Sequence, residues 1–160
     1  MTIKTGDRLP NVTLSRMGAN GPEKIETEKL FAGKKAVLFA VPGAFTPTCS
    51  AKHLPGFVAH ADAIRAKGVD LIACVSVNDA FVMNAWGKAS NAEGKVEMLA
   101  DGNGEFARAV GLELDATGFG MGKRAKRFAM ILDDGVVTHL FVEEPGAFEV
   151  SSAEHVLKAL

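Results

Sequence analysis

The sequence predicts one α/β domain over residues 1–160, with a mixed central sheet flanked by helices and an N-terminal extension. Two patterns lead to this prediction. In the first two-thirds of the chain, apolar strand-like runs alternate with segments of helical periodicity, which is typical of parallel strands joined by crossover helices. In the last third, two apolar runs flank Asp133-Asp134-Gly135, a hairpin signal that adds antiparallel strands at one edge.

Size and charge limit the classes of function. A chain of 160 residues is long enough to bury a hydrophobic core. A net charge of −1 and 23% charged residues indicate neither disorder nor a nucleic-acid-binding surface. No apolar run approaches the roughly 20 residues that span a bilayer, and the N-terminus lacks the apolar core of a signal peptide. We therefore expect a cytoplasmic protein that binds neither nucleic acid nor membrane, and a processed organellar protein would show the same features.

The N-terminal extension is predicted to form a small hairpin. Residues 11–17 alternate weakly between apolar and polar side chains, which indicates a short strand. A turn over 18–22 allows 24–27 to pair back with it. Residues 28–33 then suit a single helical turn, because Gly33 at its end tolerates the left-handed backbone conformation.

A buried strand over 36–41 and a helix running to about Lys67 frame the loop 42–49. The strand is an uninterrupted apolar run, and Gly68 is suited to end the helix. Pro55 is expected to bend this helix, because proline removes one i→i−4 hydrogen bond. Apolar residues recur along one helical face at spacings of three and four: Leu54, Phe57, Val58, Ala61 and Ile64.

Four further elements are predicted in the middle of the chain. They are a buried strand over 69–77, a helix over 80–90, a strand over 96–100 and a short helix over 104–110. Asn78 or Asp79 can cap the first of these helices, because both side chains accept hydrogen bonds from free backbone N–H groups.

The last third contains the hairpin and a final helix. Residues 112–124 show no clean period and carry alternate glycines, so we interpret them as a long loop. Strands are predicted over 127–132 and 136–142. A Ser-x-x-Glu capping box at 151–154 predicts a final helix to residue 160. This order of elements is that of a thioredoxin-like core.

Cys49 lies at the turn between the predicted strand and the predicted helix. The N–H groups of a first helical turn have no intrahelical partners, and the helix dipole favours negative charge there. The reactive thiolate form of Cys49 should therefore be favoured, and the turn should leave it accessible. Thr46 can donate and accept hydrogen bonds in the same pocket, while Pro42 and Pro47 stiffen the loop. Thr46 stands where a thioredoxin would carry the first cysteine of Cys-x-x-Cys, which favours chemistry that oxidises one thiol.

These residues resemble those of the peroxiredoxin family. Its Pro-x-x-x-Thr-x-x-Cys motif is matched by Pro42, Thr46 and Cys49. Four segments are most similar to the type II branch: Pro-Gly-Ala-Phe-Thr-Pro at 42–47, His-Leu-Pro-Gly at 53–56, Ser-Val-Asn-Asp-Ala-Phe at 76–81 and Lys-Arg-Phe at 126–128. The matches are collinear over nearly the whole chain. The resemblance implies a thioredoxin-like fold and a thiol-dependent peroxidase without a cofactor.

The resemblance also implies a role for each site residue. The Cys49 thiolate attacks a peroxide oxygen and becomes a sulfenic acid, releasing water or alcohol. Thr46 is implied to hydrogen-bond the peroxide and the thiolate. Arg127 is implied to lie over the sulfur, where a guanidinium is suitable because it is permanently charged and presents several donors. Pro42 is implied to shield the site, and backbone N–H groups near Gly43 and Cys49 to bind the oxygens.

The sequence indicates less clearly which thiol reduces Cys49 after its oxidation. Type II members that cycle alone carry a resolving cysteine near the C-terminus, but residues 150–153 here read Val-Ser-Ser-Ala. Cys74 is an alternative resolving cysteine, although it lies in the apolar run 71–77, where a thiol is usually inert. We therefore expect an external thiol, with glutathione and glutaredoxin favoured over thioredoxin, to reduce Cys49.

Other residues admit less specific interpretations. His53 could form a Cys–His pair with Cys49, or it could pack against or cap the helix. Arg127 begins an apolar strand, where a charge needs a partner or a cleft. The four histidines show no metal-ligand spacing, so no metal is expected. Type II relatives are generally homodimers, so three aromatic residues could line a subunit contact or belong to the core: Phe45, Phe81 and Phe119.

Two other classes of function fit the residues without the resemblance. A thiol–disulfide reductase of thioredoxin type would fit the order of elements, but the missing Cys-x-x-Cys argues against it. A redox-sensing binding protein would oxidise Cys49 stoichiometrically and would not turn over with any thiol.

Overall fold

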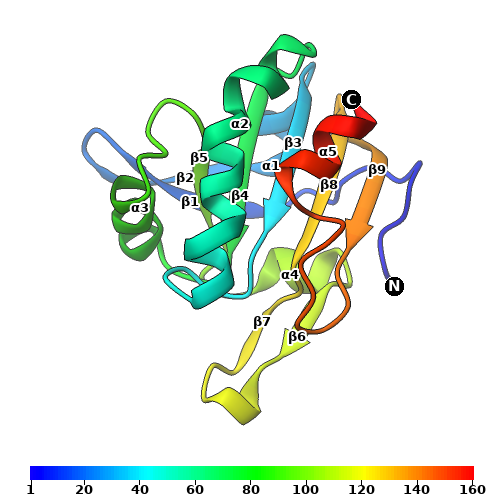
Figure 1. Cartoon of the computed structure of the whole chain (residues 1–160). Helices are drawn as coiled ribbons and strands as arrows, with labels where there is room; N and C mark the ends of the chain where they lie inside the picture. Colours follow the sequence, from blue (N-terminus) through cyan, green and yellow to red (C-terminus); the bar gives the residue numbers. More distant parts are fainter.

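The computed structural model describes all residues from 1 to 160. Its centre is a seven-stranded mixed sheet (Figure 1). Across the sheet the strands are β2 (Gly21–Glu26), β1 (Thr13–Gly18), β5 (Glu97–Ala100), β4 (Leu71–Ser76), β3 (Lys35–Ala40), β8 (Phe128–Asp133) and β9 (Val136–Val142). β3, β4 and β5 run parallel, and β8 and β9 add antiparallel pairing at the edge. The predicted mixed, thioredoxin-like sheet is therefore confirmed.

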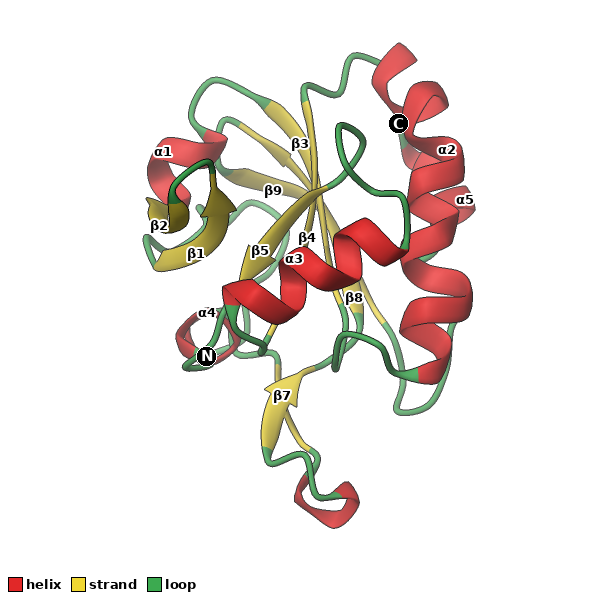
Figure 2. Ribbon diagram, turned by 90° about the vertical axis from the view of Figure 1, so that its left-hand side faces the viewer, coloured by secondary structure: helices red, strands yellow, loops and turns green.

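Helices cover both faces of this sheet (Figure 2). They are α1 (Thr27–Phe31), α2 (Leu54–Ala66), α3 (Ala80–Ala89), α4 (Glu105–Ala109) and α5 (Ala153–Ala159). α2, α3 and α5 contribute to one apolar core, while α1 and α4 contribute to the other. β3 contributes to both because successive side chains point to opposite faces: Phe39 lies in the first core and Leu38 in the second. No helix has the length and apolar character needed to cross a bilayer.

The N-terminal extension forms the predicted hairpin. β1 and β2 pair antiparallel, with Thr13 opposite Glu26 and Gly18 opposite Gly21. The hairpin joins the main sheet through one antiparallel pairing, Ser15 with Ala100 of β5. The extension thereby continues the sheet beyond the parallel strands, at the edge opposite β9.

The interpretation of residues 112–124 as a long loop is wrong. β6 (Glu113–Asp115) and β7 (Lys123–Ala125) pair antiparallel around a 3₁₀ turn over Thr117–Phe119, and this arm projects from the body of the molecule (Figures 1 and 2). Arg124 anchors the arm by donating to the carbonyls of Val77 (3.0 Å) and Met121 (3.0 Å). The strands are too short to show an alternating pattern, so local sequence did not reveal them.

The expected bend at Pro55 takes another form. Residues Cys49–His53 make a π-helical turn, in which the N–H of Leu54 donates to the carbonyl of Cys49. Pro55 lies in the first turn of the α-helix that follows. Because proline lacks an N–H and its ring clashes with the carbonyl four residues earlier, the preceding turn widens. The wide turn contains both Cys49 and His53.

The predicted cap of the last helix is displaced by one residue. The N-cap is Ser152, whose Oγ accepts from the N–H of His155 (3.1 Å), so the capping box does not begin at Ser151. The Ser151 hydroxyl instead donates to the carboxylate of Glu143 (2.6 Å). A long-range contact therefore decides which of two adjacent serines caps the helix.

Candidate active site

The cysteine loop runs from the end of β3 to the π-helical turn, and the helical backbone begins at Pro47. The amide of Asn78 holds this loop: its Oδ1 accepts from the backbone N–H of Ala44 (3.0 Å) and from the hydroxyl of Ser76 (2.6 Å). Asp79 caps α3 by accepting from the N–H of Val82 (2.8 Å). The predicted placement of Cys49 at a strand-to-helix turn is confirmed.

Arg127 lies against the sulfur of Cys49. Its Nη2 donates to Cys49 Sγ at 3.0 Å across 78 residues of sequence. Arg127 directly precedes β8 and is half-buried, so its charge lies in a medium where it acts more strongly than in water. A permanent positive charge at this distance can stabilise negative charge on the sulfur during a reaction.

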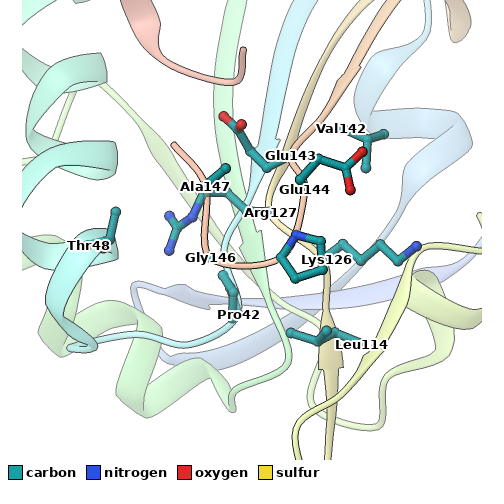
Figure 3. Close-up of a pocket in the computed structure, with 11 residues that line it drawn as sticks. Pro42, Thr48, Leu114, Lys126, Arg127, Val142, Glu143, Glu144, Gly146 and Ala147 are labelled. Atoms are coloured by element: carbon teal, nitrogen blue, oxygen red, sulfur yellow. The ribbon is translucent and has the colours of Figure 1, made fainter. Parts of the chain in front are cut away.

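A cavity of about 280 Å³ opens beside the guanidinium (Figure 3). Its lining residues come from the cysteine loop, the arm, the start of β8 and the segment after β9: Pro42, Thr48, Leu114, Lys126, Arg127, Val142, Glu143, Glu144, Pro145, Gly146 and Ala147. Pro42 therefore forms part of the wall of this cavity. Gly43 is buried, and an added Cβ there would meet Met121 Cε at 3.2 Å and Arg124 Nη1 at 3.3 Å.

The expectation that Cys49 is accessible is wrong for this conformation. The residue is 0% exposed and belongs to the larger apolar core. The cavity reaches Arg127 and Thr48 but not the sulfur itself, so the peroxide that the resemblance implies would have to displace a covering group to reach it. Sequence position at a helix start indicated the electrostatics of the turn, but it could not indicate what packs over it.

The Thr46 hydroxyl is half-buried and donates to the carbonyl of Gly43 at 2.7 Å. A hydroxyl has one proton to donate and two lone pairs. With the proton directed at Gly43, the oxygen is free to accept. The geometry therefore suits Thr46 to accept a hydrogen bond from a peroxide O–H, whereas the implied donation to the thiolate is not made here.

His53 forms hydrogen bonds with both Ser151 and Arg127. Its Nε2 lies 2.9 Å from the carbonyl of Ser151, and its Nδ1 lies 2.8 Å from Arg127 Nη1. A carbonyl only accepts, so Nε2 carries the proton and Nδ1 accepts from the guanidinium. The alternative Cys–His pair is not formed, because His53 contacts the arginine rather than the sulfur.

The ring of His53 is 0% exposed and is held neutral. Burial, reinforced by the positive charge of Arg127, lowers its pKa to about 3, although the hydrogen bond to Ser151 opposes this shift. A neutral ring is required here, because a protonated His53 would present a second donor to the guanidinium instead of an acceptor.

The low pKa of His53 predicts an acid-sensitive fold. Between pH 6.5 and about 3 the unfolded chain binds a proton at His53 that the folded chain does not, so the free energy of unfolding should fall as the pH falls. This residue contributes about 1.4 kcal/mol per pH unit in that window. Urea denaturation at several pH values should show a shallower slope for His53→Gln than for wild type. Equal slopes for the two proteins would contradict the prediction.

Cys74 lies on β4, fully buried in the same apolar core as Cys49. Burial, with a further contribution from negative charge at Cys49, raises the pKa of its thiol well above the ordinary value. No disulfide joins the two cysteines. A neutral, enclosed thiol is a poor nucleophile, which agrees with the expectation that Cys74 is inert.

Some site residues were missed from the sequence. Glu143 and Phe148 were not considered, and Asn78 was considered as a helix cap and as part of the 76–81 segment, but not as the residue that holds the cysteine loop. One signal was present: Glu143 directly follows an apolar strand, as Arg127 directly precedes one, and a charge in either place needs a partner.

Together these features define a class of protein. A thioredoxin-like sheet presents one cysteine at a strand-to-helix turn, with a guanidinium bonded to its sulfur and no second cysteine in the loop. This is the arrangement of an enzyme that carries out redox chemistry on a single thiol.

Comparisons with known proteins name the family. The model of the Redoxin family matches residues 4–157. "Peroxiredoxin-2E, chloroplastic" of Arabidopsis thaliana is 55% identical over 163 residues, covering 99% of this chain and 70% of the relative. Peroxiredoxin-2B of the same plant is 51% identical, covering 99% and 98%. The solved structure of reduced Prx3 in complex with H2O2 from Vibrio vulnificus matches with a TM-score of 0.96 and 60% identity, covering 99% of both chains.

The chain therefore belongs to the Redoxin family and, within it, to the peroxiredoxins, thiol-dependent peroxidases. The resemblance inferred from the 42–49 loop is confirmed at the level of the family.

Proposed function

We propose that this peroxidase is of type II, that it reduces hydrogen peroxide and alkyl hydroperoxides at Cys49, and that an external thiol restores it. The observation that supports the assignment of Cys49 most directly is the 3.0 Å hydrogen bond from Arg127 Nη2 to its sulfur. The same guanidinium lines the cavity, so its remaining donor capacity can stabilise a peroxide oxygen.

The proposed reaction needs no group beyond those of the chain and the substrates. The thiolate sulfur attacks the nearer peroxide oxygen, and the O–O bond breaks as the S–O bond forms. The attacked oxygen keeps its hydrogen, so Cys49 becomes a sulfenic acid, and the departing oxygen takes the electron pair and a proton from solvent water and leaves as water or alcohol. Arg127 stabilises the negative charge that moves from sulfur to oxygen, and Thr46 accepts a hydrogen bond from the peroxide.

The size of the cavity supports the inclusion of alkyl hydroperoxides. A water molecule takes up about 30 Å³ of liquid, so hydrogen peroxide would use only a fraction of about 280 Å³. Leu114, Val142 and Pro145 contribute apolar surface to this wall, beside charged residues such as Lys126 and Glu144, and this surface suits a short alkyl group. The related Prx3 structure from Vibrio vulnificus is described as a complex with H2O2, which supports the smaller substrate.

The function is tested by rapid-mixing measurements of Cys49 oxidation with hydrogen peroxide and with tert-butyl hydroperoxide. We expect Cys49 to react with both peroxides far faster than free cysteine does. A rate equal to that of free cysteine would contradict the proposal. Turnover is then measured separately with glutathione, with glutathione plus glutaredoxin, and with thioredoxin. The proposed reductant is glutathione with glutaredoxin, so turnover with thioredoxin alone would replace that part of the proposal.

The burial of Cys74 supports an external reductant. We expect Cys74→Ser to retain at least about half of wild-type turnover with glutathione and glutaredoxin, because a buried neutral thiol does not resolve the sulfenic acid. The measurement is steady-state peroxidase turnover, combined with mass spectrometry of the oxidised protein. A variant that is oxidised at Cys49 but no longer turns over would identify Cys74 as the resolving residue.

The proposed assembly is a homodimer. Phe45, Phe81 and Phe119 are 55%, 65% and 86% exposed, so they are not core residues. They lie in the cysteine loop, at the start of α3 and in the arm, and Arg124 ties the arm to Val77 just before α3. Sedimentation equilibrium would show a monomer if the proposal is wrong. The proposed location is the cytoplasm, which rests on sequence composition and is tested by cell fractionation.

A further inference from the structure

Glu143 is a buried carboxylate in the segment between β9 and α5. The residue is 7% exposed, and one of its oxygens, Oε2, accepts four hydrogen bonds. Three come from the backbone N–H groups of Glu149 (2.9 Å), Val150 (2.9 Å) and Ser151 (2.8 Å), and the fourth comes from the Ser151 hydroxyl (2.6 Å). No lysine or arginine forms an ion pair with it.

These donors hold Glu143 as an anion. Burial by itself would raise its pKa, but the hydrogen bonds from Ser151, Glu149 and Val150 outweigh burial and lower it. A carboxylate that folds a loop around itself in this way fixes the backbone of residues 149–151, because each N–H must point at the same oxygen.

The backbone held by Glu143 faces the active site. The carbonyl of Ser151 accepts from His53 Nε2, and the ring of Phe148 lies edge-on to the His53 ring, with centroids 5.0 Å apart. The guanidinium carbon of Arg127 lies 5.8 Å from the Phe148 ring centre. The N–H of Glu143 also donates to the carbonyl of Arg127 (3.0 Å). The segment 143–151 thus forms the wall against which His53 and Arg127 are set.

A path of side-chain and backbone hydrogen bonds connects the Glu143 carboxylate to the reactive sulfur. Glu143 fixes Ser151, the Ser151 carbonyl fixes the proton of His53 on Nε2, and His53 Nδ1 then accepts from Arg127 Nη1. With Nη1 engaged, Nη2 points at Cys49. If the Ser151 carbonyl moved away, His53 could carry its proton on Nδ1 instead, and a donor would then oppose the guanidinium.

We propose that Glu143 is a positioning residue for the peroxidase reaction, acting through Ser151 and His53 to hold Arg127 in contact with the Cys49 sulfur. The inference rests on the proposed role of Arg127. Glu143 also lines the cavity, but its Oε2 is directed at residues 149–151 and it makes no hydrogen bond to the sulfur. A loop clamp without influence on the site would leave the tautomer of His53 and the reactivity of Cys49 unchanged.

The test compares four variants of the full chain. Glu143→Ala removes all four acceptor contacts, Glu143→Gln keeps one acceptor oxygen, and Ser151→Ala removes the hydroxyl contact alone. Glu149→Ala is the matched control, because Glu149 lies in the same segment and its exposed carboxylate makes no hydrogen bond in the structure. Each is measured for the rate constant of Cys49 oxidation by hydrogen peroxide, for the thiolate fraction by ultraviolet absorbance, and for the His53 tautomer by ¹⁵N NMR.

We expect Glu143→Ala to slow Cys49 oxidation by about tenfold or more, since small misplacement of a catalytic group has effects of this order. The His53 signal should change from a pure Nε2–H form to a mixture. Glu143→Gln should recover part of the rate, Ser151→Ala should lose less, and Glu149→Ala should match wild type. If Glu143→Ala does not fold, Glu143→Gln and Ser151→Ala decide.

The inference is overturned if the folded variants keep both the wild-type rate and the Nε2–H form of His53. This failure differs from failure of the proposed function. If the proposed function failed, wild type would react with peroxide no faster than free cysteine does, or Arg127→Gln would react as fast as wild type. If Cys49 oxidation were slow in Arg127→Gln but proceeded at the wild-type rate in Glu143→Gln and Glu143→Ala, the role of Glu143 would be rejected and that of Arg127 retained.

Discussion

Replacing Cys49 by serine is expected to abolish peroxidase turnover. A serine hydroxyl at this position keeps a hydrogen-bonding partner for Arg127 Nη2, so the fold should be preserved. However, a hydroxyl is not ionised at neutral pH and cannot form a stable oxidised acid comparable to a sulfenic acid. Loss of an enzyme's nucleophile costs on the order of 10⁶ in rate, which places the variant below detection.

Two measurements check this result. Coupled turnover with glutathione and glutaredoxin should give no signal above the uncatalysed rate for Cys49→Ser. A sulfenic-acid-trapping reagent, followed by mass spectrometry, should label Cys49 in wild type and nothing in the variant. Cys74→Ser is the matched control, because it also exchanges a buried thiol for a hydroxyl but leaves Cys49 intact. Residual turnover in Cys49→Ser, or trapping at Cys74, would show that the chemistry occurs elsewhere.

Local sequence was sufficient for the reactive loop and for most of the sheet. Pro42, Thr46 and Cys49 lie within eight residues, and their surroundings are an apolar strand and an amphipathic helix, both of which have clear periodicities. The hairpin turn was also local: Asp134 and Gly135 both have positive φ, 49° and 78°, as the Asp-Gly signal predicts.

Two arguments indicated Arg127 as a residue of the active site, and only one of them was a physical argument. Its position beside an apolar strand required a partner or a cleft for its charge, and the resemblance to peroxiredoxins supplied the partner. The structure then placed its Nη2 at 3.0 Å from the sulfur. A charge argument alone would not have chosen Cys49 among the possible partners, because the two residues are 78 positions apart.

The remaining features depend on contacts between distant segments. Ser151 matched a capping box, but Glu143 binds its hydroxyl, so Ser152 caps the helix. His53 was considered as a base for Cys49, but its ring is bonded to Ser151 on one side and to Arg127 on the other. In both cases the partner that decides the outcome lies more than one helical turn away in the sequence. The same reason explains why the burial of Cys49 was not foreseen.

Replacing Arg127 by glutamine should have the second-largest effect, a reduction of about 10²- to 10³-fold in the rate constant for Cys49 oxidation. Arginine contacts both Cys49 Sγ and His53 Nδ1 through different nitrogens, and it brings a positive charge to the sulfur. Glutamine has one amide group to donate, so it can serve one of these partners, and it has no charge. The variant should therefore lose both thiolate stabilisation and stabilisation of the departing oxygen.

These two losses can be separated by pH. A smaller thiolate fraction is restored by raising the pH, because the thiol then ionises without help. Stabilisation of charge on the peroxide in the transition state is not restored. We therefore expect the rate constant of Arg127→Gln to rise with pH to a plateau that stays well below the wild-type plateau. Arg127→Lys should lie between them, because a single ammonium keeps the charge but cannot reproduce the planar fork that contacts two partners.

Rapid-mixing measurements over a pH series test this expectation, with Arg108→Gln as the matched control. Arg108 is exposed and pairs with Glu113 at 3.8 Å, remote from the sulfur, so its replacement should leave the profile unchanged. If Arg127→Gln reached the wild-type plateau at high pH, the arginine would act only by ionising Cys49. If its rate equalled that of wild type at every pH, the 3.0 Å contact would have no part in the chemistry, and peroxide activation would have to come from the loop 42–49 alone.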